Sequence, residues 1–512
     1  MAAAPKTFAF VFPMATGHFN PSLALARSLV DLGHSVHYLC FERMQRCIED
    51  TGAAFHSAVE YETELYGSRD ADVPGAFAAL KREHGLEEES FIIAYQKLQN
   101  VQLELQLPGV LRFLRAVKPD AVLYCPVINR EAPLAASLLG LASIALLTFA
   151  GPGSRCHSQR AMLREVGIGV EALEDLKRGF EPNVAAARRL RSEYGIAVQE
   201  GVAKPFGRMD VLRHSALTLV TTSEALQDRV PPELASAYRE EGSKFCFVGP
   251  LLDQDGAARA GTCEDDARIL QKVRWARTSG RQVVLVSMGT VITSDTPGLG
   301  WSHRPIDAAG QPHGLTGKQL CQAAWSAAFD AFGEDAAESG PLILVAVGLQ
   351  PDPMSGIAVP PNAVCAQNLP QVDILRAGVD AFLTHCGQNS FMEAMANRTP
   401  VVCCPGFGDQ FANARKAVDV GVGLAVDRPH PPADCEATAL LAYRADVRQA
   451  LRRVFTEASF REAAGRCAED LRGAGGVPKA VELIVDVARG GASDDGAVKA
   501  AMRARTLLAA GA

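Results

Sequence analysis

The sequence has little of what marks a secreted, metal-scaffolded or nucleic-acid-binding protein. Its 512 residues hold 51 Lys and Arg against 58 Asp and Glu, so no basic excess is present for phosphate backbones. The 13 cysteines are scattered, and no two of them form a CxxC pair. Scattered cysteines are typical of reduced thiols rather than of disulfides or zinc sites. We therefore expect a cytoplasmic protein with no nucleic-acid partner and no metal.

Apolar runs long enough to cross a membrane are also scarce. Residues 8–12 (FAFVF) are too short for a signal peptide and end at Pro13. Residues 132–150 carry no charge over about the length of a bilayer span, but Gly140 divides them into an Ala/Leu-rich helix and a segment of strand length. A buried helix followed by a buried strand has this pattern in α/β proteins. We expect no transmembrane segment.

What the sequence does contain is a regular alternation of strand-like and helix-like segments. With 48% apolar and 21% charged residues it has an ordinary globular composition, and its length exceeds that of a single core. The strand-like runs are TFAFVF (7–12), SVHYLC (35–40), AVLYC (121–125), SIALLTF (143–149), LTLVTT (217–222), QVVLVSMG (282–289), LILVAVG (342–348), AFLTH (381–385) and PVVCCP (400–405). The alternation predicts two Rossmann-like, doubly wound parallel sheets with helices on both faces.

Composition also indicates the boundaries of the two units. A Gly-Pro pair followed by small polar residues favours a linker at 249–265. The expected domains are then residues 1–248 and 266–479, with a C-terminal helix in 480–512 that returns to the first domain and ends in a tail. The Gly/Pro-rich stretch 291–318 is longer than an ordinary loop, which indicates a functional or disordered segment.

Polar side chains follow two consecutive strands of the second half. His385 ends the strand at 381–385, and Asp409 follows the strand at 400–405. Because the carboxyl ends of parallel strands meet at one rim, we expect both side chains to face the same crevice, where ligands of such sheets bind.

A helix is expected to begin near Asn389 or Ser390, just beyond His385. Its free N–H groups and positive dipole end would form a phosphate site. Ser390 and Glu393 also fit a capping box, in which they would serve only the helix itself. The residues alone leave both interpretations open.

A longer segment carries a resemblance to a known family. The run LPQVDILRAGVDAFLTHCGQNSFMEAMANRTPVVCCPGFGDQFANARKAVDVGVGL (369–424) resembles the nucleotide-sugar signature of family 1 glycosyltransferases, the UDP-glycosyltransferases, which include macrolide glycosyltransferases. PMATGHFNPSLALARSL, SMGT and FVGPLL are similar to other parts of that family. The resemblance implies the GT-B fold, in which two Rossmann-like domains face each other across a cleft. The first would bind the acceptor and the second the nucleotide-sugar donor.

The resemblance also implies a role for each donor-site residue. Expected at the pyrophosphate are His385, Gly387, Gln388, Asn389 and Ser390, with Gly17, Gly289 and Thr290 from neighbouring loops. Expected at the nucleoside are Leu369, Gln371 and, on the ribose, Glu393, while Asp409 and Gln410 would hold the sugar. Many relatives stack a Trp on uracil where this chain has Asn368, so backbone groups at Leu369 are expected to read the base.

The first domain is expected to supply the catalytic base. Asn20 and Pro21 suit the N-cap and first position of a helix, which would place His18 in the turn before it. A neutral imidazole can take a proton from a hydroxyl near neutral pH. The resemblance implies this role for His18.

The partner of that base departs from the family pattern. Relatives commonly place an Asp at the end of the strand that matches PDAVLYC, and this chain has Cys125 there. Asn129 and Glu131 follow the strand and are alternative partners. Loss of the carboxylate would leave His18 less firmly oriented and its imidazolium less stabilised.

These residues and the resemblance predict an inverting, UDP-sugar-dependent glycosyltransferase. It would move a hexose, with glucose favoured, to a hydroxyl of a lipophilic small molecule and form a β-glycoside, with no cofactor beyond the UDP-sugar co-substrate. Asp70-Ala71-Asp72 matches the metal triplet of glycosyltransferases of another fold, but it lies in a polar loop, and a helix N-terminus can meet the pyrophosphate charge instead. The alternatives are a UDP-sugar epimerase of the same fold and a sugar-nucleotide-binding protein with little or no turnover.

Overall fold

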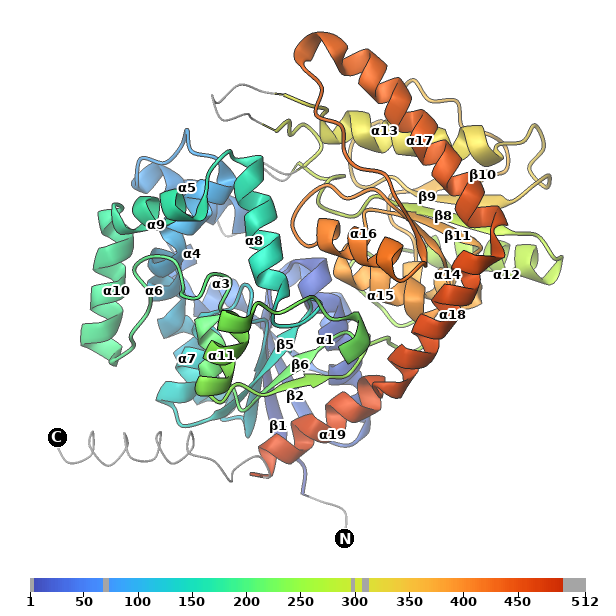
Figure 1. Cartoon of the computed structure of the whole chain (residues 1–512). Helices are drawn as coiled ribbons and strands as arrows, with labels where there is room; N and C mark the ends of the chain where they lie inside the picture. The colour runs from blue at the N-terminus through green and yellow to red at the C-terminus, as the bar shows by residue number, and fades with distance from the viewer. Residues whose placement is uncertain (1–3, 68–72, 296–299, 306–312, 491–512) are drawn as a thin grey trace.

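The chain folds into two α/β domains, each built on a parallel sheet, in a computed structural model that describes residues 4–67, 73–295, 300–305 and 313–490 (Figure 1). The prediction of two doubly wound parallel sheets is confirmed. The triplet at 70–72, the expected tail, and residues 296–299 and 306–312 of the long stretch at 291–318 lie outside the described residues.

The first sheet has seven strands in the order β3-β2-β1-β4-β5-β6-β7, and the second has six in the order β10-β9-β8-β11-β12-β13. The strands of the first are β1 (Thr7–Val11), β2 (Ser35–Cys40), β3 (Ala54–Ser57), β4 (Ala121–Tyr124), β5 (Ala142–Leu147), β6 (Leu217–Val220) and β7 (Phe245–Phe247). Those of the second are β8 (Val283–Ser287), β9 (Leu342–Ala346), β10 (Ala363–Ala366), β11 (Ala381–Thr384), β12 (Val401–Cys403) and β13 (Gly423–Ala425). The strand order reverses between β1 and β4 and between β8 and β11, the positions at which such sheets bind ligands.

Helices cover both faces of each sheet. The first domain has α1 (Thr16–Asp31), α2 (Gln45–Glu49), α3 (Ala58–Tyr61), α4 (Thr63–Tyr66), α5 (Val73–Glu83), α6 (Phe91–Val117), α7 (Glu131–Leu138), α8 (Ser154–Glu165), α9 (Val170–Arg178), α10 (Glu181–Tyr194) and α11 (Pro232–Glu240). The second has α12 (Asp266–Thr278), α13 (Gly317–Phe332), α14 (Gln371–Ala377), α15 (Gln388–Ala396), α16 (Gln410–Asp419), α17 (Glu436–Thr456) and α18 (Ala458–Gly473), followed by α19 (Gly476–Ala488).

The inner strands are apolar on both sides because each face of the sheet has its own core. In β1, Phe8 and Phe10 belong to one buried cluster, and Ala9 and Val11 belong to the cluster on the opposite face. The period of two along a strand produces this division. Strand β8 repeats it in the second domain, and this is why both runs read as continuous hydrophobic segments.

Helix α1 begins earlier than expected. Its N-cap is Ala15, and Pro21 lies inside the helix, so the prediction that Asn20 and Pro21 start it was wrong. His18 therefore occupies the first turn of α1 rather than the loop before it. The Asn20 side chain instead accepts a hydrogen bond from the backbone N–H of Ala260, 3.1 Å away.

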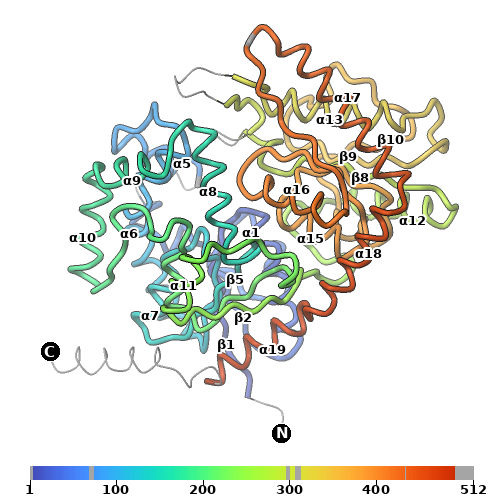
Figure 2. The backbone as a smooth tube through the Cα atoms, in the orientation of Figure 1, coloured from blue at the N-terminus to red at the C-terminus, as the bar shows by residue number. Residues whose placement is uncertain are grey.

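The chain crosses between the domains twice. The first crossing follows β7 at Val248 and Gly249, and the second joins α18 to α19, which packs on α1 of the first domain (Figure 2). The two crossings touch, because the N–H of Gly476 donates to the carbonyl of Val248 at 2.7 Å. A Cβ on Gly249, whose φ is +76°, would lie 3.0 Å from the carbonyl oxygen of Leu471.

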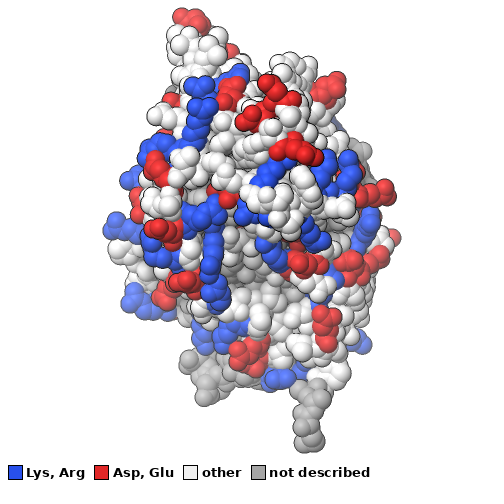
Figure 3. All heavy atoms as spheres, turned by 90° about the vertical axis from the view of Figure 1, so that its right-hand side faces the viewer, with Lys and Arg blue, Asp and Glu red and all other residues white. Residues whose placement is uncertain are grey.

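Among the described residues, no helix is long and apolar enough to cross a membrane, and no group of three or more His, Cys, Asp or Glu is arranged to hold a metal ion. On the face shown in Figure 3, positive and negative side chains alternate over the surface. The described parts of 291–318 are fixed to the second domain, since buried Trp301 packs on Trp325 and Arg304 forms an ion pair with Glu436.

Candidate active site

His18 lies at the point where the strand order of the first sheet reverses. Its Nδ1 atom is 2.8 Å from Thr148 Oγ1, beyond the end of β5, and 3.5 Å from Cys125 Sγ, beyond the end of β4. The ring of Phe149 contacts the imidazole edge-on, with centroids 5.7 Å apart. Because Nδ1 is occupied by these two groups, Nε2 is the nitrogen left for a substrate.

Burial lowers the pKa of His18 from 6.5 to about 4, because the surroundings desolvate the charged ring. The imidazole is therefore neutral at pH 7. Neutral imidazole carries one N–H, and donating it from Nδ1 to Thr148 leaves a lone pair on Nε2. This tautomer is the one a general base requires.

Cys125 occupies a position suited to an anion. The thiol is fully buried, and burial raises its pKa to about 12, while the backbone N–H groups of Ile128, Val127 and Asn129 act in the opposite direction by stabilising the thiolate. Successive N–H groups of this kind form an anion-binding nest. A carboxylate at this position would receive the same hydrogen bonds.

The two other candidate partners do not reach His18. The side-chain amide of Asn129 donates to Glu131 at 3.0 Å, and neither side chain contacts the imidazole. Thr148, the nearer of the two actual partners, was not predicted. Its place in SIALLTF, as a polar residue at the end of an apolar strand, was the available signal.

In the second domain, His385 is held between two glycines. A Cβ on either Gly289 or Gly387 would lie 2.6 Å from the imidazole Nε2, so only glycine fits at both positions. Burial lowers the pKa of His385 to about 4, and its Nδ1 has no hydrogen-bond partner within the described residues. A neutral, desolvated imidazole thus sits beside the N-terminus of α15, at the reversal between β8 and β11.

The first turn of α15 differs from the expected capping box. Gly387 is the N-cap, so Ser390 lies within the helix, and its hydroxyl accepts from Gln371 at 3.1 Å. The capping-box interpretation of Ser390 and Glu393 was therefore wrong. The N–H of Gln388 is bound by Asp409 at 3.1 Å.

Glu393 already has a cationic partner. Both Nη atoms of Arg259, from the segment between the domains, lie 3.2 Å from its Oε1, and Gln371 donates to Oε2 at 2.6 Å. Glu393 is 6% exposed, so the pair is largely removed from water. Arg259 was not predicted, because nothing in its local sequence distinguishes it. The same segment passes Asn368, which lies 3.4 Å from a Cβ placed on Gly261.

Asp409 and Gln410 open helix α16. One oxygen of Asp409 accepts from Gln388 and, at 3.2 Å, from Asn413, and burial raises the pKa of Asp409 to about 6. The side-chain oxygen of Gln410 accepts from the N–H of Gly406 at 2.8 Å. Within the described part of the chain, these bonds fix both side chains through one polar atom of each.

The domains meet directly at the expected site. The amide of Asn389 donates to the carbonyl of Gly17 at 2.8 Å, and the hydroxyls of Thr16 and Thr290 are 3.4 Å apart. The Gly17 carbonyl is free for this bond because Pro21, four residues on, has no N–H to donate within α1.

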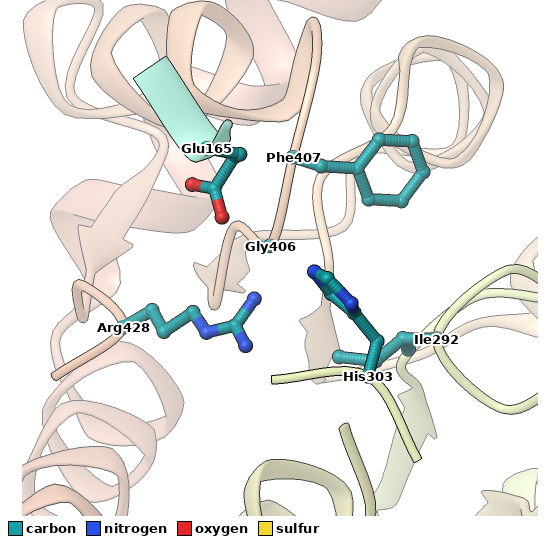
Figure 4. A pocket seen from close by; sticks show the side chains of 6 residues that line it. All are labelled: Glu165, Ile292, His303, Gly406, Phe407 and Arg428. Carbon is teal, nitrogen blue, oxygen red and sulfur yellow. The ribbon is translucent and has the colours of Figure 1, made fainter. Parts of the chain in front are cut away.

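A small cavity lies beside the loop that holds Gly406 and Phe407 (Figure 4). Gly406 and Phe407 line it with His303 and Arg428 of the second domain, and Glu165 enters from α8 of the first. The Glu165 carboxylate points toward the Arg428 guanidinium, and burial raises the pKa of Glu165. The cavity therefore has a charged wall at the domain boundary.

The family described as "UDP-glucoronosyl and UDP-glucosyl transferase" matches residues 350–468, which contain α15, α16 and the loops that position His385 and Asp409. The NDP-glycosyltransferase YjiC of Bacillus licheniformis is 23% identical over 410 residues, or 80% of this chain and 82% of that protein. These similarities support the resemblance of the chain to family 1 glycosyltransferases.

Solved structures share the fold of this chain. The glycosyltransferase of kitacinnamycin matches with a TM-score of 0.61 at 20% identity, over 94% of this chain and 99% of that one. Spinosyn rhamnosyltransferase SpnG, complexed with thymidine diphosphate, matches with a TM-score of 0.55 at 16% identity, over 93% and 99%. The two-domain architecture is therefore GT-B.

Proposed function

We propose that this glycosyltransferase moves a hexose, with glucose favoured, from UDP to a hydroxyl of a small molecule with a lipophilic skeleton, with inversion to a β-glycoside. The observation that carries the proposal is that the two strand-order reversals face each other. His18 stands at one, His385 and the N-terminus of α15 stand at the other, and the Thr16–Thr290 contact joins them.

In the proposed mechanism, His18 Nε2 takes the proton of the acceptor hydroxyl as its oxygen attacks the anomeric carbon. Thr148 holds the productive tautomer through Nδ1. Attack on the face opposite the leaving group accounts for inversion.

The leaving diphosphate would be received by the second domain. His385 and the first N–H groups of α15 supply hydrogen bonds and the positive end of a helix dipole, so we propose that no metal is needed to neutralise the pyrophosphate. The free atoms of Asp409 and Gln410 would hold the sugar hydroxyls, while Gln371, Glu393 and backbone groups at Leu369 would hold the nucleoside.

The test is incubation of the purified protein with UDP-glucose or TDP-glucose and a panel of phenols, sterols and macrolides, with products identified by mass spectrometry. We expect transfer from UDP-glucose, no loss of rate in EDTA, and a loss of about 10²–10⁴-fold in His18→Ala with UDP affinity retained. Release of an altered sugar nucleotide without acceptor would identify an epimerase. Donor binding without any product would identify a binding protein.

A further inference from the structure

A second cavity lies in the first domain among α6, α8, α9 and the chain that leads to residue 211. Pro126 forms part of its wall and directly follows Cys125, the residue 3.5 Å from His18. Arg155 lines it from the start of α8, close along the chain to Thr148. The cavity is thus built on the ends of β4 and β5, the same strands that position the general base.

Four basic side chains line this cavity: Arg208 and a group of three, Arg130, Arg155 and Lys177. Lys177 is only 6% exposed and its ammonium donates to a neutral group, Gln99, at 2.8 Å. Arg130 has a buried Nη1 atom with no hydrogen-bond partner among the described residues. No carboxylate of the described chain forms an ion pair with any of the three.

Arg208 lines the same cavity but, unlike the other three cations, has carboxylate partners. Its guanidinium is neutralised by Asp210 at 2.6 Å and by Glu241 at 3.3 Å. The cavity therefore contains one cation that is satisfied within the protein and three that are not.

The unpaired cations repel one another. Burial, followed by the charges of Arg130 and Arg155, lowers the pKa of Lys177 to about 7, against the smaller opposing effects of Glu174 and Asp210. Buried like charges are costly unless a counter-charge accompanies them, and the remaining donors of this group point to a negatively charged ligand.

We propose that the acceptor of this glycosyltransferase carries an anionic group, such as a carboxylate or sulfate, which Arg130, Arg155 and Lys177 bind while its hydroxyl reaches His18. This inference rests on the proposed function, because that function is what makes the bound ligand an acceptor. Leu173, Val202 and Met209 supply apolar wall for the skeleton of such a ligand. A neutral lipophilic molecule would leave the three cations unpaired.

The binding test needs no donor. Calorimetry would compare 4-hydroxybenzoate and 4-hydroxybenzenesulfonate with the neutral methyl 4-hydroxybenzoate, and thermal melts would compare sodium sulfate with sodium chloride at equal ionic strength. We expect the anions to bind at least about tenfold more tightly than the ester, since hydrogen bonds to charged groups are the stronger ones. We also expect sulfate to raise Tm.

Arg155→Gln and Lys177→Met should each remove most of that preference. Lys177→Met keeps the packed side-chain stem and eliminates the buried charge, so loss of folding is not expected. Arg164→Gln, on the exposed side of α8, is the matched control and should leave the preference intact. Equal binding of anions and ester, absence of any anion binding, or an unchanged preference in both cavity variants would overturn the proposal.

The transfer assay separates the two hypotheses. Glucosylation of neutral acceptors with no preference for acids would refute the anionic acceptor and leave the proposed function standing. Anion binding that depends on Arg155 and Lys177, with no transfer from any donor, would refute the proposed function and leave an anion site.

Discussion

At the scale of single residues, the unusual feature is that His18, the proposed general base, has no carboxylate partner among the described residues. His18 is paired with a hydroxyl and a thiol, and its pKa of about 4 reflects burial with no compensating charge. A carboxylate in this position normally orients the imidazole and stabilises the imidazolium that forms. The nest of N–H groups around Cys125 is nevertheless present.

Cys125→Asp should therefore convert the site to a conventional dyad. The new carboxylate would raise the pKa of His18, so kcat/KM should increase and its decline on the acidic side should move to higher pH. The acidic limb moves to higher pH because a rate that needs neutral His18 falls as the pH drops through the pKa of His18. A pH–rate profile of wild type, Cys125→Asp and the uncharged control Cys125→Ser would measure it. An unmoved profile with a lower Tm would mean that the carboxylate is merely buried without a partner.

The glycines around His385 allow a second residue-scale prediction. Gly289→Ala should weaken UDP binding by about tenfold or more, because its Cβ would lie 2.6 Å from the imidazole that faces the phosphate site. Gly280→Ala is the control, since Gly280 has a similar φ of +76° but nothing within 4 Å of its Cβ position. Titration with UDP measures the affinity. Thermal melts of both variants measure the stability that each loses by placing alanine at a positive φ. Similar UDP affinities in the two variants would argue against close packing of His385.

At the scale of elements, the sequence pattern predicted the inner strands of both sheets but not the edge strands. β3, β7, β10 and β13 are the outermost strands of the two sheets, and each has three or four residues. A strand with a neighbour on one side only does not need a continuous apolar run, so its signal is weak. The proposed donor-site residues His385 and Asp409 were expected at one rim because they follow neighbouring strands within one local motif. Thr148 and Arg259 meet their partners only through the tertiary fold.

The segment between the domains contributes the third prediction. Arg259→Gln should raise the KM for the donor and leave kcat within a few-fold of wild type, because it removes the cation that orients buried Glu393 at the nucleoside end. Arg268→Gln is the control, since that residue makes only an exposed ion pair on α12. A cycle with Glu393→Gln should show that the two effects are not additive. Additive losses would mean that Arg259 acts elsewhere.

At the scale of the whole molecule, the paired crossings determine how the domains can move. The first crossing touches the second, so the chain connections between the domains lie together at one edge, while the Asn389–Gly17 and Thr16–Thr290 contacts join the domains at the candidate site. Such a joint favours hinge rotation about that edge over sliding or separation. Helix α19 belongs to the core of the first domain although it follows the second in sequence.

Gly249→Ala should disturb this joint. Its Cβ would press on the backbone of Leu471 at 3.0 Å, in addition to the strain of positive φ, and we expect a fall in Tm together with a lower kcat. Gly256→Ala, in the same linker with a φ of +70° and open space around it, is the control for strain alone. Equal effects of the two substitutions on Tm and kcat would show that contact between the crossings is unimportant.

The hydrogen bond from Asn389 to the Gly17 carbonyl joins the two domains, and it depends on the missing N–H of Pro21. With any other residue at position 21, its backbone N–H would donate to the Gly17 carbonyl within α1. Asn389 would then have to share that acceptor. Pro21→Ala should therefore make α1 more stable and weaken the contact between the domains. We expect Tm to rise and small-angle scattering to report a less closed arrangement. In this protein, a backbone N–H that is missing inside α1 leaves an acceptor for a contact between the two domains.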